Sequence, residues 1–571
     1  MKKITLFFLM CCLFLVGFIA CGAKESSHVS DSTSPEEQGS SDTTTQSTTT
    51  LKTTTAAPAF LFDTDYTPVL PTPDAPETVY IMSKPSSIDD RLAAVSVQGV
   101  LAKSSGNRII IEYDKSVTNF ITTIKSHYRG TCAFKTASSV WTYLKQNPTA
   151  VKGYILTDLG DDSINVATSL AGLLHAVIVT RSNRSSADTL GLSCLVDVTD
   201  KDDAWLRQSE YFAKLNRDVA FMLTPNNVEC LRDYAIFNEA YFFTDADTTQ
   251  LALRNRVSFM NPGFTVLGWN NNCGEHGTVS ALSALNGCLI PSDYAKNLAT
   301  LASFPLKEAK QKTEIVTTGG KGKHTVCLVM SDGDNLQWIL NDFMTSDKWY
   351  ASFRRGKFPF SFGLPASTVD IASPALVYYY KNMKKTEEFI MELSGLGYTF
   401  PSKWKDATAL ADMQRKVVES MKRTDMSVLE ILDDVTLSQS VVDTYYQGFL
   451  TDSAIQGALY IDYGNYAAYN GKIFWTGGKP IVTAKYRLWA GTDEIEDIAA
   501  AINRATTNEK NAGAYTFVTV HAWSGLDENG NLVANGNTME AVYKLVSLLD
   551  EDVELVTPSV LIDRITNNVK H

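Results

Sequence analysis

Short apolar runs alternate with stretches of helical periodicity along the chain from residue 77 onward. In the first part, five runs rich in β-branched residues predict strands: 79–82, 108–113, 153–157, 176–180 and 194–198. Helices are expected between them, for example at 88–102, 138–146 and 166–174. Because short apolar strands separated by helices favour a parallel sheet covered on both faces, residues 77–225 are predicted to form a three-layer α/β domain.

The remaining residues, 226–571, repeat this alternation more regularly. Eight strand-like runs follow one another: 264–270, 324–331, 358–364, 388–394, 427–432, 457–463, 481–489 and 514–521. Helical stretches separate most of them, for example 406–423, 438–450, 493–506 and 538–549. The last has Asn537 and Glu540 in the capping-box arrangement. Eight β/α units over about 300 residues predict a (β/α)8 barrel of the TIM type, and a doubly wound open sheet is the alternative.

The first 21 residues follow a different pattern. Lys2 and Lys3 precede an apolar run at 4–20, which leads directly to Cys21. A basic start, an apolar core and a small residue before the cut are typical of an export signal, and the cysteine resembles the lipidated residue of a bacterial lipoprotein signal. We therefore expect a lipoprotein signal peptide with Cys21 lipidated; an uncleaved transmembrane anchor is the alternative.

Residues 22–76 are predicted to be a disordered tether. Between residues 26 and 55, 18 of 30 positions are Ser or Thr, and five prolines follow before residue 77. Such a stretch cannot bury enough apolar surface to offset its ordering entropy. The tether would hold the folded part off a lipid anchor, at the extracellular face of the bacterial cytoplasmic membrane or at the cell surface.

Composition and short motifs exclude several function classes. Lys and Arg number 51 against 63 Asp and Glu, a net charge of −12, which lacks the basic footprint of a nucleic-acid partner. No GxGxxG follows a strand and no GxxxxGK[ST] occurs, so no nucleotide cofactor is expected. No CxxC pair suggests zinc, and most cysteines are interpreted as buried thiols, with one disulfide left open. The cysteines beyond residue 21 are Cys132, Cys194, Cys230, Cys273, Cys288 and Cys327.

Carboxylates, amides and aromatic rings gather where the predicted barrel strands end, which is where a TIM-type barrel carries its active site. The candidate catalytic residues are Glu275, Asp332, Asp334 and Asp462. The candidate substrate-binding residues are Trp269, Asn335, Tyr398, Asp433, His521 and Trp523. Among these, the aromatic side chains would offer flat apolar faces to sugar rings.

Most of these residues also have a purely structural interpretation. Asp332 and Asp334 bracket a glycine, and such a sequence is ordinary turn chemistry. Asp433 is typical of a helix N-cap, and His521 at a strand end is typical of a hydrogen-bonded structural residue. Both interpretations stay open for each residue at this level.

Paired carboxyl groups favour glycoside cleavage. That reaction needs one carboxyl group kept protonated by its surroundings and another that is ionised as nucleophile or base. The acidic residues at the predicted strand ends, together with aromatic walls, supply those parts. The chain has neither a GxSxG nucleophile elbow nor an HExxH helix, which disfavours a serine esterase or a zinc peptidase.

One segment carries a family resemblance. Residues 395–401 read Gly-Leu-Gly-Tyr-Thr-Phe-Pro, which resembles the signature of the GxGYxYP family, with Phe400 at the second tyrosine. The segments 331–335, 268–269 and 231–234 are also similar to this family. The resemblance spans most of residues 77–560 and implies an exported, carbohydrate-active protein with an N-terminal domain and a barrel-like C-terminal domain. It supplies no mechanism, because the family's assignment to glycoside hydrolysis is itself a hypothesis.

The sequence therefore predicts a lipid-anchored glycoside hydrolase that acts on an extracellular polysaccharide or oligosaccharide, without metal or other cofactor. Two alternatives stay open. One is a metal-dependent polysaccharide deacetylase, with Asp332 and Asp334 as ligands beside His276 or His521. The other is a non-catalytic glycan-binding lipoprotein of the cell surface, in which the carboxylates only accept hydrogen bonds from hydroxyl groups.

Overall fold

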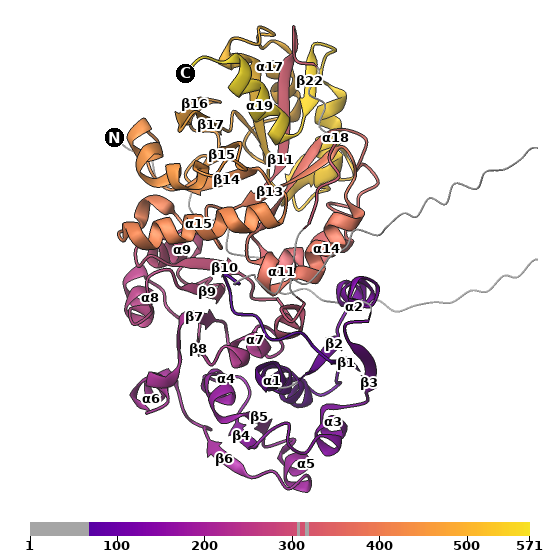
Figure 1. Ribbon diagram of the computed structural model, residues 1–571, viewed down its shortest axis with the longest axis vertical. Coiled ribbons are helices and arrows are strands. Elements are labelled where there is room, and N and C mark those ends of the chain that lie inside the picture. Colours follow the sequence, from indigo (N-terminus) through magenta and orange to yellow (C-terminus); the bar gives the residue numbers. More distant parts are fainter. Residues whose placement is uncertain (1–67, 105, 129, 305, 307–308, 315–318) are drawn as a thin grey trace, which may run out of the picture. The chain divides into compact units, whose positions relative to one another are not determined.

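The computed structural model describes residues 68–571 except 105, 129, 305, 307–308 and 315–318 (Figure 1). The predicted leader, Cys21 and the predicted tether as far as residue 67 lie outside the described residues. Within the described part, we find no helix with both the length and the apolar character that crossing a membrane requires.

The first described residues are fixed to a segment far away in the sequence. The backbone N–H groups of Val69 and Leu70 donate to Oδ2 of Asp370 at 2.8 and 2.9 Å. Asp370 is buried in the short helix α13 (Thr368–Ile371), and the Leu70 side chain is buried beside it. The chain is therefore attached at this point before the first strand, β1 (Thr78–Ser83), begins.

The strands between residues 77 and 200 form two small parallel sheets. One has the order β2-β1-β3 and the other the order β5-β4-β6. These further strands are β2 (Asn107–Glu112), β3 (Ala133–Ala137), β4 (Gly153–Thr157), β5 (Ala176–Thr180) and β6 (Cys194–Asp197). Parallel pairing is confirmed, whereas the strands of the predicted three-layer domain are divided between two sheets. Helix α1 (Ile88–Ser104), buried from residue 92 to 102, packs against β2 and against β5 and so occupies the space between the two sheets.

A third parallel sheet has the order β10-β9-β7-β8. Its strands are β7 (Asn216–Met222), β8 (Ala240–Phe243), β9 (Thr265–Gly268) and β10 (Cys288–Pro291). The run that the sequence places as the first barrel strand, 264–270, is β9 and belongs here, so that prediction is wrong. Strand β7 precedes residue 225 in the sequence and the other three strands follow it. The sheet therefore crosses the domain boundary that the sequence places at this residue.

The other seven predicted runs lie in one large sheet of ten strands, with the order β16-β17-β15-β14-β13-β12-β11-β19-β18 and β22 beside β11. Its strands are β11 (His324–Met330), β12 (Phe360–Pro365), β13 (Glu387–Glu392), β14 (Val428–Asp433), β15 (Gly457–Asp462), β16 (Ile473–Thr476), β17 (Lys479–Thr483), β18 (Tyr486–Leu488), β19 (Tyr515–Val520) and β22 (Val553–Val556). Only β16 pairs antiparallel, with β17. The small antiparallel pair β20 (Ser524–Leu526) and β21 (Leu532–Ala534) lies apart from this sheet.

The large sheet is curled into a half-barrel, and an eight-stranded TIM barrel is not confirmed. The predicted strand 481–489 is divided into β17, which pairs with β15, and β18, which pairs with β19. Strand β22 pairs with the first four residues of β11, whereas β12 pairs with the last two residues of β11. These departures arise because the pairing partner of a strand is decided by tertiary packing, which an apolar run does not encode.

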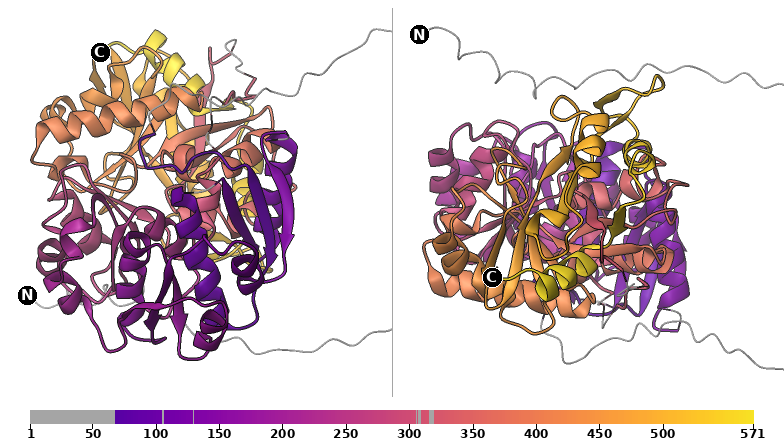
Figure 2. Two further views of the ribbon diagram at one scale, coloured as in Figure 1. Left: turned by 60° about the horizontal axis from the view of Figure 1, so that its bottom comes forward. Right: turned by 90° about the horizontal axis from the view of Figure 1, so that it is seen from above.

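Helices lie beside the strands of the large sheet (Figures 1 and 2). The helices of six or more residues, besides α1, are α2 (Lys115–His127), α3 (Val140–Gln146), α4 (Ser163–Leu174), α5 (Arg184–Thr189), α6 (Asp203–Gln208), α7 (Arg232–Phe237), α8 (Gln250–Val257), α9 (Glu275–Ser283), α14 (Ser373–Asn382), α15 (Ala407–Arg423), α17 (Ile495–Asn503), α18 (Thr538–Ser547) and α19 (Pro558–Asn568). Asp406 caps α15 by accepting from the N–H groups of residues 408 and 409. Asn537 caps α18 by accepting from Glu540 N at 3.2 Å, as its sequence predicts.

The cysteines that follow residue 21 are free thiols. Cys230, Cys288 and Cys327 are buried, as interpreted from the sequence. Cys132 and Cys273 are half-buried and Cys194 is exposed. The disulfide that the sequence leaves open does not form among these described residues.

Candidate active site

Four carboxyl groups meet at the carboxyl ends of β11, β13 and β14. Asp332 and Asp334 follow β11, Glu392 ends β13, and Glu430 lies inside β14. Glu392 and Glu430 have no exposed surface and Asp334 is 3% exposed, whereas Asp332 is half-buried. Asp332 and Asp334 are thus brought together, as predicted, with two further acidic residues beneath them.

Two glycines make room for the Glu392 side chain. Gly333 N donates to Oε2 of Glu392 at 2.6 Å. A Cβ on Gly333 would lie 2.2 Å from the carbonyl oxygen of Gly363, and a Cβ on Gly363 would lie 1.8 Å from Cδ of Glu392. The preceding Asp332 has a φ of 71°, a conformation that Asp tolerates better than most residues. The Asp-Gly-Asp sequence therefore makes a turn, and the turn also positions carboxyl groups.

The buried carboxyl groups lack the hydrogen bonds that would stabilise their charged forms. Among the described residues, Oε1 and Oε2 of Glu430, Oε1 of Glu392 and Oδ2 of Asp334 have no hydrogen-bond partner. Burial, reinforced by Asp332 and Asp334, raises the pKa of Glu430 to about 8. Burial and the neighbouring carboxyl groups also raise the pKa of Glu392 and of Asp334 well above the usual range. Glu430 therefore retains its proton at neutral pH, and the same burial favours the protonated forms of Glu392 and Asp334.

Glu275 approaches this cluster from the third sheet. It opens α9, which follows β9, and the hydroxyl of Tyr398 donates to its Oε1 at 2.8 Å. The residue as a whole is exposed, but the protein around its carboxyl group raises the pKa, and the charge of Asp332 adds to that effect. Although β9 is not a strand of the large sheet, Glu275 and Asp332 are thus electrostatic neighbours.

The Gly-Leu-Gly-Tyr segment joins the third sheet to the large one. Leu289 in β10 and Tyr398 form an isolated antiparallel bridge, in which Leu289 N donates to Tyr398 O at 2.9 Å. A Cβ on Gly397 would lie 2.3 Å from the carbonyl oxygen of Leu289. The second glycine of the motif is therefore required by close backbone approach, and Tyr398 is held with its hydroxyl on Glu275.

Phe400 occupies an apolar environment at the position of the family's second tyrosine. It is fully buried and packs edge-on against Tyr398 and Tyr463, at ring-centroid distances of 5.7 and 5.4 Å. The ammonium group of Lys403 lies 5.0 Å from its ring centroid. The ring of Phe400 thus fills the site without needing a hydrogen-bond partner.

Asp433, a predicted sugar ligand, holds the polypeptide instead. It is fully buried, and its two oxygens accept from Ser402 N and Ser402 Oγ, each at 2.8 Å, and from the Tyr446 hydroxyl at 2.9 Å. Asp434 N donates to it as well, at 2.8 Å. These bonds attach the segment after the motif to the end of β14 and leave Asp433 a positioning role.

A second polar cluster surrounds Asp434. Its Oδ2 lies 2.8 Å from Nε2 of His276 and 2.5 Å from Nζ of Lys403. Burial alone would raise the pKa of Asp434, but Lys403 and His276 outweigh it and hold that pKa below its usual range. Asp462, half-buried at the end of β15, has Asp434 as its acidic neighbour and accepts from Asn465 N at 3.0 Å. Asp462 thus belongs to this second cluster rather than to the central one.

Aromatic rings line the side of the site near His521. Trp489 lies flat on the His521 ring, at a centroid distance of 4.0 Å and an interplanar angle of 4°. Burial lowers the pKa of His521, although Asp332 acts in the opposite direction, so the imidazole is neutral at neutral pH. The ring centroid of Tyr466 lies 5.1 Å from that of Trp489. Burial raises the pKa of the Tyr466 hydroxyl, and Asp332 and Glu275 add to that effect.

The remaining predicted residues have more local roles. Trp523 packs against Trp338 and Trp349, at centroid distances of 4.8 and 5.4 Å, in an aromatic cluster. The half-buried Trp269 donates its indole N–H to Asn271, two residues on, at 3.1 Å. Asn335 donates to the carbonyl oxygen of Asp332 at 3.3 Å and so closes the turn after β11.

Sequence reasoning misses Glu392 and the Lys403–Asp434 pair. Glu430, Tyr466 and Trp489 do lie in or directly after predicted strands. A feature of the sequence that points to Glu392 and Glu430 as site residues is an acidic residue inside a short strand that is fully buried. The signal is ambiguous, because Glu388 in the same strand has a structural role. Its Oε2 accepts from the N–H and hydroxyl of Ser559, both at 3.0 Å. In the described ranges, no group of three or more His, Cys, Asp or Glu side chains is arranged to hold a metal ion.

The fold places the protein in the class of mixed α/β proteins with a curled, mostly parallel sheet, and the cluster of carboxyl groups lies at the strand ends of that sheet. Within that class, three segments of the chain match models of GxGYxYP domains. Residues 322–566 match the model described as "GxGYxYP putative glycoside hydrolase C-terminal domain". Residues 217–303 match the "GxGYxYP third domain" and residues 151–215 the "GxGYxYP_N second domain".

A solved structure shares this architecture. It is described as a "putative hydrolase from Bacteroides thetaiotaomicron VPI-5482", and its sequence is 25% identical to this chain. The match covers 87% of this chain and 96% of that one, with a TM-score of 0.77. No curated protein sequence matches the chain.

Proposed function

We propose that the chain is a glycoside hydrolase in which Glu275 and Asp332 act on the glycosidic bond. The observation that carries this proposal is their position as electrostatic neighbours at the edge of a buried group of carboxyl side chains. Glycoside cleavage needs two such groups with opposed protonation states. The match of residues 322–566 to a model named for glycoside hydrolysis supports the same chemistry.

Glu275 is proposed as the general acid. Its raised pKa keeps the carboxyl group protonated closer to neutral pH than that of an ordinary glutamate. The Tyr398 hydroxyl on Oε1 fixes the orientation of the group, so that Oε2 can carry the proton to the leaving-group oxygen.

Asp332 is proposed as the nucleophile or base. It is the half-buried member of the four strand-end carboxyl groups, and so it is the one that a substrate can contact. Asp334, Glu392 and Glu430 lie behind it and support the reaction by their protonation. When they are protonated, they add no negative charge beside Asp332.

The sugar is proposed to lie against Trp489 and Tyr466. Both residues are half-buried, they contact each other, and Trp489 also covers His521. Flat apolar rings beside carboxyl groups are suited to a sugar ring, which has apolar C–H faces and polar edges.

The test compares Glu275→Gln and Asp332→Asn with Glu210→Gln, a control that removes an exposed carboxyl group from a surface ion pair. Release of reducing sugar from a panel of polysaccharides would identify the substrate, and NMR of the first product would give the anomeric outcome. We expect each active-site variant to lose at least about 10²-fold in kcat and the control to retain wild-type activity. Wild-type rates in both active-site variants would overturn the assignment.

The place of action is proposed to be the outer face of the cytoplasmic membrane or the cell surface, with a lipid on Cys21. The basic start, the apolar run at 4–20 and the cysteine support it. Metabolic labelling with an alkynyl fatty acid, followed by cell fractionation, tests it. The wild type should be labelled and membrane-bound, and Cys21→Ala should be unlabelled. An unlabelled wild type in the soluble fraction would contradict the anchor.

A further inference from the structure

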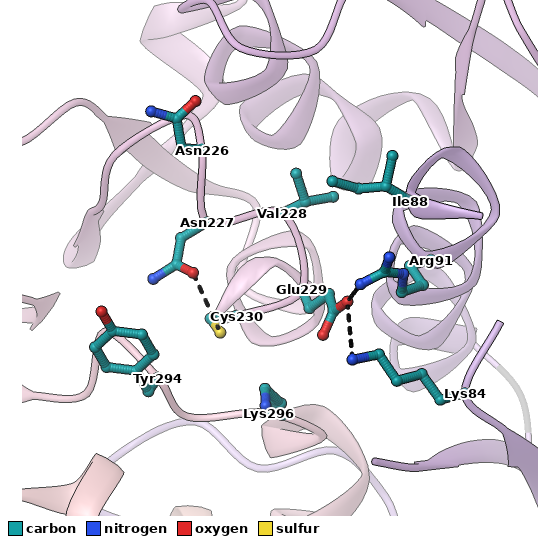
Figure 3. A pocket seen from close by; sticks show the side chains of 10 residues that line it. All are labelled: Lys84, Ile88, Arg91, Asn226, Asn227, Val228, Glu229, Cys230, Tyr294 and Lys296. Atoms are coloured by element: carbon teal, nitrogen blue, oxygen red, sulfur yellow. Dashed lines mark hydrogen bonds and ion pairs between the residues drawn. The ribbon is translucent and has the colours of Figure 1, made fainter. Parts of the chain in front are cut away.

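A cavity of about 260 Å³ lies apart from the carboxyl cluster, among the small parallel sheets (Figure 3). Loops that follow three strands, together with the first turn of α1, build its wall. Lys84 and Arg91 follow β1, residues 226–230 follow β7, and residues 294 and 296 follow β10. Ligands of open parallel sheets bind at the carboxyl ends of the strands, where neighbouring loops separate. The position of this cavity is therefore that of a binding site.

The charges around the cavity are mostly positive. Lys84, Arg91 and Lys296 line it, against a single carboxyl group of the wall, Glu229. Figure 3 shows Lys84 and Arg91 converging on Glu229, and the Lys84 ammonium group lies 3.7 Å from that carboxylate. Asp293, which is not part of the wall, is half-buried, and burial raises the pKa of its carboxyl group to about 6.

Lys296 is the cation that remains available. Its ammonium group lies 4.9 Å from the ring centroid of Tyr113, and that of Lys84 lies 5.7 Å from the same ring. Among the ion pairs of the described residues, Lys296 takes part in none. An aromatic face holds a lysine in place without neutralising it, so Lys296 presents a full positive charge beside the cavity.

The rest of the wall supplies an aromatic ring and an amide. Tyr294 is 52% exposed, which is unusual for a residue of its size. Asn227 is positioned by the bond from its Nδ2 to the carbonyl oxygen of Asp293, at 2.9 Å. A cation, an exposed ring and an oriented amide, gathered in a cavity smaller than most drug-sized pockets, suit one small ring that carries an anionic group.

We propose that this cavity binds an anionic sugar unit, with its carboxylate or sulfate on Lys296 and its ring on Tyr294. The anionic group follows from the lysines alone, whereas the choice of a sugar rests on the proposed function. The site would let the protein retain an acidic glycan away from the residues that cleave it.

The experiment measures binding to the folded protein by ligand-observed NMR and calorimetry. The probes are glucuronic acid, glucose 6-sulfate, glucose and sodium sulfate. We expect the two anionic sugars to bind, and glucose and sulfate to bind at least about tenfold more weakly. Lys296→Met should weaken binding by about tenfold or more, and Tyr294→Ala should weaken the sugars but not sulfate.

Lys357→Met is the matched control, because Lys357 likewise lies over an aromatic ring, that of Phe353, at 4.7 Å. It should bind the probes as the wild type does. Equal binding of sulfate and the anionic sugars would mean an anion site without sugar recognition, and unchanged binding in Lys296→Met would overturn the proposal. Glu275→Gln and Asp332→Asn should bind the probes normally, so failure of the hydrolase assignment and failure of this site give different results.

Discussion

At the scale of single residues, Glu430 has an unusual environment for a carboxyl group. It is fully buried in β14, and neither of its carboxyl oxygens has a hydrogen-bond partner in the described part of the chain. A carboxyl group in this position is tolerated because it is protonated. Its protonation is therefore tied to folding as well as to the proposed reaction.

The first prediction concerns the pH dependence of stability. Folding raises the pKa of Glu430 from 4.5 to about 8, so its contribution to stability is complete below about pH 4.5 and is lost as the pH rises toward 8. Glu430→Gln removes this loss and should be more stable than the wild type at pH 8 by about 1–3 kcal/mol. Urea unfolding at pH 5 and pH 8 measures it. Equal pH dependence in the variant and the wild type would mean that Glu430 does not titrate in this range.

The second prediction concerns the space around Glu392. Gly363→Ala should destabilise the protein by at least about 3 kcal/mol, because the new Cβ would lie 1.8 Å from the Glu392 carboxyl carbon. Adding Glu392→Ala should recover much of the lost stability. Gly464→Ala is the control, since its Cβ would meet only Asp462 Oδ1, at 3.4 Å. Thermal unfolding measures all three, and a double variant as unstable as Gly363→Ala would argue against this contact.

At the scale of elements, the motif segment connects two sheets. Leu289 in β10 pairs with Tyr398, whose hydroxyl reaches Glu275, and Asp433 at the end of β14 holds Ser402. One stretch of chain thus sets the position of a residue from the third sheet against the end of the large sheet. The motif acts by positioning the carboxyl group of Glu275.

The third prediction tests that role. Tyr398→Phe removes the hydrogen bond that favours the charged form of Glu275, so the pKa of this carboxyl group should rise further. The alkaline limb of the kcat/KM profile should then move to higher pH, while the free energy of unfolding falls by only about 1 kcal/mol. An alkaline limb that does not move would contradict the role of Glu275 as the acid.

A companion variant is Phe400→Tyr, which introduces the residue typical of the family. The ring is fully buried among Tyr398 and Tyr463, so the added hydroxyl group needs a partner that the described surroundings do not plainly offer. It should lower stability and leave the pH profile unchanged.

The sequence is informative about elements and less so about their partners. Seven of the eight predicted runs are strands of the large sheet, because a buried strand needs a short apolar run wherever it pairs. Strand β9 has the same pattern but pairs with β7 and β10, and residues 481–489 divide between two neighbours. These outcomes depend on contacts between distant segments, which periodicity does not record.

The same limit applies to the site. Asp332, Asp334 and Glu275 could be found because acidic residues follow apolar runs. Glu392 lies within such a run, and its environment depends on the glycines of two other segments. Asp433 resembled a site residue by position, yet its oxygens are occupied by Ser402 and Tyr446.

At the scale of the whole molecule, the proposed site needs both halves of the described chain. Glu275 follows β9 in the sheet of residues 216–291, whereas Asp332 follows β11 in the large sheet. The C-terminal family domain at 322–566 contains Asp332 and Tyr398 but not Glu275.

The fourth prediction follows from this division. A protein limited to residues 319–571 should be inactive on any substrate that residues 68–571 cleave, because it lacks the proposed acid. Circular dichroism would establish whether the shorter protein is folded, and adding separately purified 68–318 tests for recovery. Full activity of 319–571 alone would exclude Glu275 from the reaction.

The bond between Asp370 and the N–H groups of Val69 and Leu70 has a mechanical consequence. When the described part is pulled from its N-terminal side, the load reaches α13 through Val69, nine residues before β1 begins. Strand β1 is the central strand of its sheet, and peeling it away would break both of its ladders at once. The Asp370 clamp therefore takes up tension before it reaches that strand.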